Sequence, residues 1–102
     1  MDLLVRIKRL ILAGNVIFTT KAALEMSADD LTRALVCEAI VAAAAITKKL
    51  RSKNPLTGER ETLYVIKGLT YDGILIYTKG KIAKIREQEV FYVLISSKRA
   101  IN

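Results

Sequence analysis

The sequence predicts an α+β fold in which about three N-terminal helices pack on one face of a four-stranded, mainly antiparallel β-sheet. Two observations predict this class. Apolar residues at helical spacing and helix-capping residues occupy the chain up to Ile46, whereas β-branched and aromatic residues between turn signals occupy the remainder. A length of 102 residues suits one hydrophobic core. Residues 1–102 are therefore expected to form a single domain.

The first helix is predicted from apolar residues at three- and four-residue spacing. Gly14 and Asn15 supply the left-handed stop that helices commonly use, and residues 16–18 follow as a short extended link. The periodic apolar residues are Leu3, Leu4, Ile7, Leu10 and Ile11.

Two further helices are predicted from caps and periodicity. Thr19 or Thr20 caps a brief helix that runs through Met26, because a threonine hydroxyl accepts the free amide hydrogens of a first turn. A residue within 27–30, or Thr32, caps the third helix. Its alanines should let the helix backbone lie close to the element that it covers. One side of this helix carries Leu31, Leu35, Val36, Ala39, Ile40 and Ala43.

Four strands are predicted at residues 46–52, 62–70, 74–85 and 90–97. Short connections such as Asp72 and Gly73 predict antiparallel neighbours. Gly80 interrupts the third strand, which is therefore one bent strand, a bulged strand or two short strands.

The net charge of +7 lies entirely in the second half of the chain. Residues 1–46 hold five basic and five acidic groups, whereas residues 47–102 hold twelve basic and five acidic groups. A basic half joined to a neutral half is typical of proteins that bind polyanions. The alternative is that the charge only keeps the protein soluble.

Several classes of function are disfavoured by composition. The longest apolar run, residues 39–46, is too short to cross a bilayer, and the basic residues near the N-terminus interrupt any signal-peptide core. Cys37 is the only cysteine and there is no histidine, so an internal disulfide, an ordinary zinc site and a histidine-dependent nucleophile are excluded. The acidic residues are scattered. We expect a cytoplasmic protein without a metal or cofactor.

Alternation along the first strand predicts where its cations point. Leu50 shares a face with Lys48, while Lys49 and Arg51 share the other. If Leu50 points toward the helices, then Lys49 and Arg51 lie on the uncovered face, where we expect the surplus cations to converge. Cations among tyrosines form a surface typical of single-stranded nucleic acid binding. Residues of the later strands that can join this surface are Tyr64, Lys67, Tyr77, Lys79, Lys81, Tyr92, Lys98 and Arg99.

One catalytic chemistry remains open, because RNA supplies its own nucleophile. The RNA 2′-hydroxyl attacks the adjacent phosphate while the enzyme stabilises the added charge and transfers protons. Arginine can hold the phosphate and tyrosine can act as an acid. Lys49 is a candidate base, because the nearby cations Lys48, Arg51 and Lys53 disfavour its ammonium form. The alternative is that these lysines stay charged and only hold phosphates.

The segments VIFTTKAAL and VFYVLISSKR, with the order of helices and strands between them, give the chain a family likeness over about residues 5–99. The chain resembles the messenger-RNA-cleaving bacterial toxins of the RelE-like fold, above all the MqsR branch and a related group of uncharacterised domains. This resemblance implies active lysines and a tyrosine on the sheet. The segment ITKKLRS offers Lys48 or Lys49, TLYVIKG offers Tyr64, and IYTKGKI offers Lys79 or Lys81. The arginines used by the wider group correspond to Arg51 and Arg99.

The resemblance implies a metal-independent endoribonuclease toxin of a type II toxin–antitoxin pair, which acts on free or ribosome-bound mRNA. An antitoxin protein from an adjacent gene would hold it inactive. The alternatives are a non-catalytic RNA-binding module and a basic partner-binding domain of the same fold. The expected catalytic residues are Lys49, Arg51, Tyr64 and Lys81, and the expected RNA-binding residues are Lys48, Lys53, Arg60, Lys67, Lys79, Lys98 and Arg99.

Overall fold

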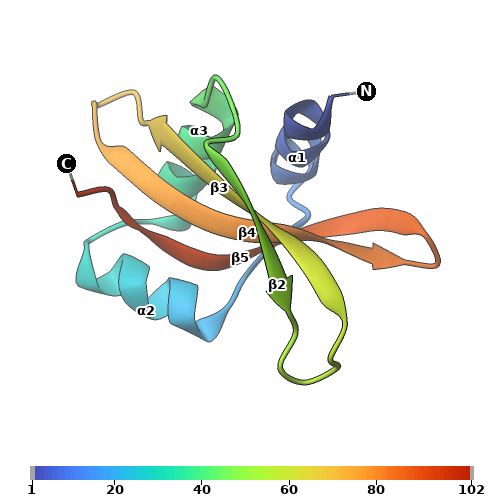
Figure 1. Cartoon of the computed structure of the whole chain (residues 1–102). Helices are drawn as coiled ribbons and strands as arrows, with labels where there is room; N and C mark the ends of the chain where they lie inside the picture. Colours follow the sequence, from blue (N-terminus) through green and yellow to red (C-terminus); the bar gives the residue numbers. More distant parts are fainter. Residues whose placement is uncertain (1, 102) are drawn as a thin grey trace.

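A computed structural model, which describes residues 2–101, shows a chain folded into helices and a mixed sheet (Figure 1). The helices come first and most of the sheet follows, so the protein belongs to the predicted α+β class. In chain order the elements are α1 (Leu3–Leu12), β1 (Val16–Phe18), α2 (Thr20–Ala28), α3 (Arg33–Ala42), β2 (Lys48–Lys53), β3 (Arg60–Leu69), β4 (Leu75–Ile85) and β5 (Gln88–Arg99).

The helix ends follow the local signals in the sequence. The Thr19 hydroxyl accepts a hydrogen bond from the Ala22 backbone N–H at 3.2 Å, and the Thr32 hydroxyl accepts one from Leu35 at the same distance. Both threonines satisfy amide hydrogens that have no partner within their helix. Gly14, with φ of +79°, turns the chain after α1. The first of the two predicted caps, Thr19, and the Thr32 cap are confirmed.

The sheet has five strands in the order β1-β5-β4-β3-β2. Strands β2 to β5 pair antiparallel, as predicted, and β1 pairs parallel with β5. The expectation of four strands was incomplete, because the segment predicted as an extended link is β1. Its three residues are too few for a strand pattern, and its pairing with Tyr92, Val93 and Leu94 depends on tertiary structure.

Strand β4 is one continuous strand, which excludes the predicted alternative of two short strands. Its register with β5 shifts between Lys79 and Gly80 and between Ala83 and Lys84, and in both places the extra residue, Ile95 or Val90, belongs to β5. The bulges therefore lie in β5 and not in β4. A Cβ atom on Gly80 would lie 2.7 Å from the Tyr92 ring. Glycine at this position therefore lets the Tyr92 ring lie directly on β4.

All three helices contribute residues to one buried core that packs closely on the sheet. Gly68 shows how closely, because a Cβ atom there would lie within 1.9 Å of the Ala39 carbonyl oxygen in α3. The short side chain of Ala39 permits this approach, as predicted for the alanines of this helix. The buried core comprises Leu4, Ile7, Ile11, Ala22, Met26, Leu31, Val36, Ala39, Ile40 and Ala43 before the main sheet, and Ile66, Ile76, Tyr92 and Leu94 within it.

The two faces of the sheet are named here from β3. The helix-side face carries Tyr64, Ile66 and their cross-strand partners, because both residues pack on the helical core. The open face carries Leu63, Val65, Lys67 and their partners, because neighbouring residues of a strand point to opposite faces. Within residues 2–101, no helix is long and apolar enough to cross a membrane.

Two hairpins diverge from the centre of the sheet. β3 pairs with β4 only from Tyr64 to Leu69, and its earlier residues stay with β2. The outer part of β4 stays with β5 from Lys81 onward. Figure 1 shows the β2–β3 hairpin and the β4–β5 hairpin extending in different directions.

Candidate nucleic-acid interface

The register of β2 decides which way its cations point. Lys49 lies opposite Tyr64 and Arg51 lies opposite Thr62, so both cations occupy the helix-side face. Leu50 lies opposite Leu63 on the open face. The interpretation that Leu50 points toward the helices was wrong, because Leu50 packs with another leucine on the side away from them.

The cations of the second half lie on both faces of the sheet, so the expected convergence on a single uncovered side was wrong. Alternation along each strand divides them. The hairpin cations, on the helix-side face of the β2–β3 hairpin, are Lys49, Arg51, Lys53 and Arg60. The open-face lysines are Lys48, Lys67, Lys79, Lys81 and Lys98.

Arg99 belongs to neither set, although it was predicted to contact RNA. Its side-chain Nε donates to the Asp29 backbone oxygen at 3.0 Å, and its backbone N–H donates to the Asp29 carboxylate at 2.8 Å. These contacts fasten the end of β5 to the end of α2. Arg99 is therefore placed as a structural residue.

The hairpin cations form an exposed cluster without acidic partners. Lys53 and Arg60 are direct cross-strand neighbours, and together with Arg51 they border one surface hollow. Ion pairs in residues 2–101 join only Arg6 to Glu89 and Lys81 to Glu61. The four charges of the hairpin cations are thus available to an external anion.

Lys48 was expected to crowd Lys49, but the two side chains point to opposite faces of β2. The nearest residues to Lys49 on its own face are Tyr64, across the strand pair, and Arg51, two positions along β2. The cationic surroundings of Lys49 are therefore weaker than predicted.

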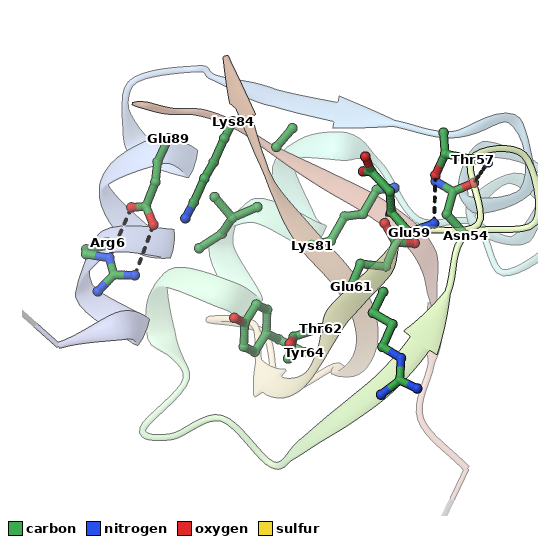
Figure 2. Close-up of a pocket in the computed structure, with 13 residues that line it drawn as sticks. Arg6, Asn54, Thr57, Glu59, Glu61, Thr62, Tyr64, Lys81, Lys84 and Glu89 are labelled. Carbon is green, nitrogen blue, oxygen red and sulfur yellow. Dashed lines mark hydrogen bonds and ion pairs between the residues drawn. The ribbon is translucent and has the colours of Figure 1, made fainter. Parts of the chain in front are cut away.

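A cleft of about 550 Å³ lies between the two hairpins (Figure 2). Tyr64 and Thr62 line it from β3. One end is closed by Arg6, which donates to the Glu89 carboxylate at 3.0 and 2.9 Å. The remaining lining residues are Asn54, Thr57, Glu59, Arg60, Glu61, Lys81, Ile82, Ala83, Lys84 and Glu89.

Lys81, predicted as the second catalytic lysine, is already paired. Its Nζ lies 2.9 Å from the Glu61 carboxylate, and each side chain is 25% exposed. The pair joins the two hairpins at the cleft and neutralises Lys81. Sequence reasoning missed this role of Glu61, because the contact depends on how β3 and β4 separate.

The hairpin turn is ordered by Asn54, which sequence reasoning did not select. Its side-chain oxygen accepts from the backbone N–H groups of Leu56 at 2.9 Å and Thr57 at 3.4 Å. The signal was present in the sequence, because asparagine before Pro55 favours such a turn. This turn fixes the outer wall of the cleft.

The four tyrosines have different environments. Tyr64 is half-buried at the cleft, and Tyr77 lies on the open face with the Lys98 ammonium 5.6 Å from its ring centroid. Tyr71 is 94% exposed in the turn before β4. Tyr92 lies in the core, and burial, followed by the charge of Tyr64, raises its pKa. The idea that Tyr92 contributes to an exposed surface was wrong.

The Tyr92 hydroxyl has no hydrogen-bond partner within residues 2–101. It extends from β5 across Gly80, whose cross-strand neighbour on β3 is Tyr64. The core tyrosine therefore supports the strand position from which Tyr64 projects.

Within residues 2–101, no three His, Cys, Asp or Glu side chains lie close enough to hold a metal ion. Comparisons of the chain with protein-family models, curated proteins and solved structures give no match. Function is therefore inferred from the local geometry.

Proposed function

We propose that this protein is a metal-independent endoribonuclease of RelE-like fold that binds mRNA along the β2–β3 hairpin. One observation carries the proposal. Four exposed cations without acidic partners lie on the same face as Tyr64 and beside a cleft. Such a surface holds a polyanion and presents a phenolic hydroxyl to it.

Binding follows from the spacing and chemistry of the hairpin cations. Lys49, Arg51 and Lys53 recur on one face of β2 at about 7 Å, which is two strand residues. Arginine presents several N–H donors in a plane and binds phosphate oxygens two at a time. An extended RNA backbone can therefore follow the strand, with one base directed toward Tyr64.

Cleavage would use the 2′-hydroxyl of the bound RNA. Lys49 is the proposed general base, which accepts the 2′-hydroxyl proton as the 2′-oxygen bonds to phosphorus. Arg51 stabilises the negative charge on the phosphoryl oxygens. The bond from phosphorus to the 5′-oxygen then breaks, and Tyr64 donates its proton to that oxygen. The products are a 2′,3′-cyclic phosphate and a 5′-hydroxyl. Lys81 can assist only after Glu61 releases it.

The fold agrees with this assignment through β2 to β5, which supply four antiparallel strands behind N-terminal helices. β1 adds a fifth strand to that arrangement. In the proposed setting the protein is a cytoplasmic bacterial toxin, and an antitoxin from an adjacent gene restrains it.

A second candidate is an RNA-binding module without catalysis. The Lys81–Glu61 ion pair favours it, because this pair removes one predicted catalytic cation from the cleft. Both candidates predict that affinity for RNA falls linearly with salt on logarithmic axes.

The test is incubation of the protein with mRNA in EDTA, with and without ribosomes. The proposal predicts new 2′,3′-cyclic or 3′-phosphate ends. Tyr64→Phe should abolish cleavage while retaining RNA affinity, and Tyr71→Phe, at an exposed site away from the cleft, should cleave normally. Salt-sensitive binding without cleavage in either condition would establish the second candidate. If the protein shows no RNA binding and no cleavage, both candidate functions are excluded.

A further inference from the structure

The open face of the sheet carries two adjacent lysine-bearing rows with an apolar row on each side. Each row runs across the strands through residues that are direct neighbours in the ladder. In order along β3, the rows are Leu69 with Leu75, Lys67 with Tyr77 and Lys98, Val65 between Lys48 and Lys79, and Leu63 with Leu50.

The charge of this face is nearly all positive. Five lysines lie on it, and Glu61 is the only carboxylate on its β2–β4 part within the described residues. Glu61 is engaged by Lys81, so the remaining four lysines have no acidic partner on that part of the face. A ligand of this face must bring negative charge.

The floor of the face is aliphatic although the helices lie on the other side. Val65 is 4% exposed and Leu63 is 7% exposed. Lys48 and Lys79 flank Val65, and lysine stems commonly lie over apolar surface while their ammonium groups stay in water. Leu69 remains 55% exposed at one end of the face. The lysines thus keep an apolar sheet surface soluble when it is unoccupied.

This chemistry suits protein better than RNA. The open face has no arginine among its cations, and its tyrosine, Tyr77, has Lys98 over the ring at 5.6 Å, where a base would have to stack. Aliphatic side chains lie beside the lysines, with Val65 inside one lysine row and leucines in the two outer rows. Carboxylates can pair with the lysines while apolar side chains of the same ligand contact the accessible leucines.

We propose that the open face binds an acidic, amphipathic segment of another protein. The segment would place its apolar residues on the accessible leucines Leu50, Leu69 and Leu75 and its carboxylates on the flanking lysines. This proposal does not depend on ribonuclease activity, because it uses the opposite face of the sheet from Tyr64. A second copy of this chain is a poorer occupant, because its own open face is also basic.

The probe is a synthetic helical peptide with leucines on one side and glutamates flanking them. Its control is a peptide of the same composition in scrambled order, which has equal charge but no apolar stripe. Binding is measured by calorimetry and by backbone amide chemical shifts of the full chain. The test variant is Lys67→Glu with Lys98→Glu, and the matched variant is Lys49→Glu with Arg51→Glu, which makes the same charge change on the other face.

The amphipathic peptide should bind at least tenfold more tightly than the scrambled peptide and should shift amides of β3, β4 and β5. The open-face variant should lose this binding, and the hairpin variant should retain it. Leu69→Asn should weaken it without changing the charge. Equal binding of the two peptides, equal losses in the two variants, or no saturable binding would overturn the proposal. So would single-stranded RNA that shifts the open-face amides in place of the hairpin amides. Loss of RNA cleavage in the hairpin variant would test the ribonuclease separately.

Discussion

The two cationic surfaces of this sheet have similar charge and different surroundings. The hairpin cations include two arginines and adjoin a cleft with a half-buried tyrosine. The open-face lysines cover aliphatic residues, and the Lys98 ammonium lies over the ring of Tyr77, the tyrosine of that face. Charge alone therefore does not assign a ligand to either surface. What distinguishes them is whether the side chains beside the cations are polar, as Thr62 and Tyr64 are, or aliphatic, as Val65 and Leu63 are.

The six residues of β2 generate both surfaces. Lys49, Arg51 and Lys53 point to the helix-side face, and Lys48 and Leu50 point to the open face. A slip of one residue in the register with β3 would exchange the two sets. The pairing of Leu50 with Leu63 favours the observed register, because it places both leucines on one surface.

The largest expected effect tests which face the helices cover. Gly68→Ala places a methyl group within 1.9 Å of the Ala39 backbone oxygen, and the backbone of α3 must move to accept it. We expect a loss of roughly 3 kcal/mol or more in the free energy of unfolding, measured by denaturant titration.

The control is Lys67→Ala, one residue earlier on the open face, which should change stability by less than about 0.5 kcal/mol. Equal losses in the two variants would contradict the assignment of faces on which the comparison rests.

The next effect separates the two surfaces by their affinity for RNA. Arg51→Glu with Arg60→Glu removes two phosphate-binding groups and introduces repulsion, so RNA affinity should fall roughly 30- to 100-fold. The slope of log affinity against log salt should decrease by about 1.4, which is about 0.7 for each lost phosphate contact. Filter binding or fluorescence anisotropy across a salt series measures both quantities.

Lys67→Glu with Lys98→Glu makes the same change of net charge on the open face. Its RNA affinity should fall by less than about threefold, because only long-range electrostatics are affected. An equal or larger fall than in the hairpin variant would place RNA on the open face.

Local signals in the sequence predicted most of the helices and strands. The features that the sequence did not predict depend on contacts between residues far apart in the chain. Thr19 and Thr32 identified helix starts because their capping contacts lie within three residues. The orientation of Leu50 depends on a partner in another strand. Sequence reasoning likewise missed Glu25, whose carboxylate accepts from the Ser96 hydroxyl at 2.7 Å and the Ser97 N–H at 3.1 Å.

The candidate site was predicted in part for the same reason. Lys49, Arg51 and Tyr64 were selected from the sequence, and the structure brings them to one face. The site was nevertheless placed on the wrong side of the sheet. The neutralisation of Lys81 by Glu61 could not be predicted, because it arises where two hairpins diverge.

A smaller effect tests the support beneath Tyr64. Tyr92→Phe removes a buried hydroxyl without a hydrogen-bond partner in the described chain, so stability at neutral pH should stay equal or rise by up to about 1 kcal/mol. Burial raises the pKa of Tyr92 above its ordinary value of 10.0, so the folded state keeps the proton that the unfolded state loses. This contribution to stability is present below pH 10.0 and is lost as pH rises further.

The Tyr92→Phe variant should therefore lose stability less steeply above that pH, by up to about 1.4 kcal/mol per pH unit. Denaturant titrations at pH values below and above 10.0 measure this dependence of stability on pH. Tyr71→Phe is the control, because that side chain is 94% exposed and its removal should leave the alkaline slope unchanged. A steeper slope in the Tyr92 variant would contradict the buried position of its hydroxyl.

The smallest effect concerns the Lys81–Glu61 ion pair, which joins the two hairpins at the cleft. Glu61→Gln removes the charge that neutralises Lys81 but keeps the size of the side chain, so Lys81 gains freedom to contact phosphate. A partly exposed ion pair contributes at most about 1 kcal/mol, so RNA affinity should rise no more than about fivefold and stability should change little. Glu59→Gln, a change at an exposed residue of the same cleft, controls for net charge. If Lys81 acts in cleavage, the cleavage rate should increase in Glu61→Gln and not in Glu59→Gln. Equal rates in the two variants would show that Lys81 takes no part in the chemistry at Tyr64.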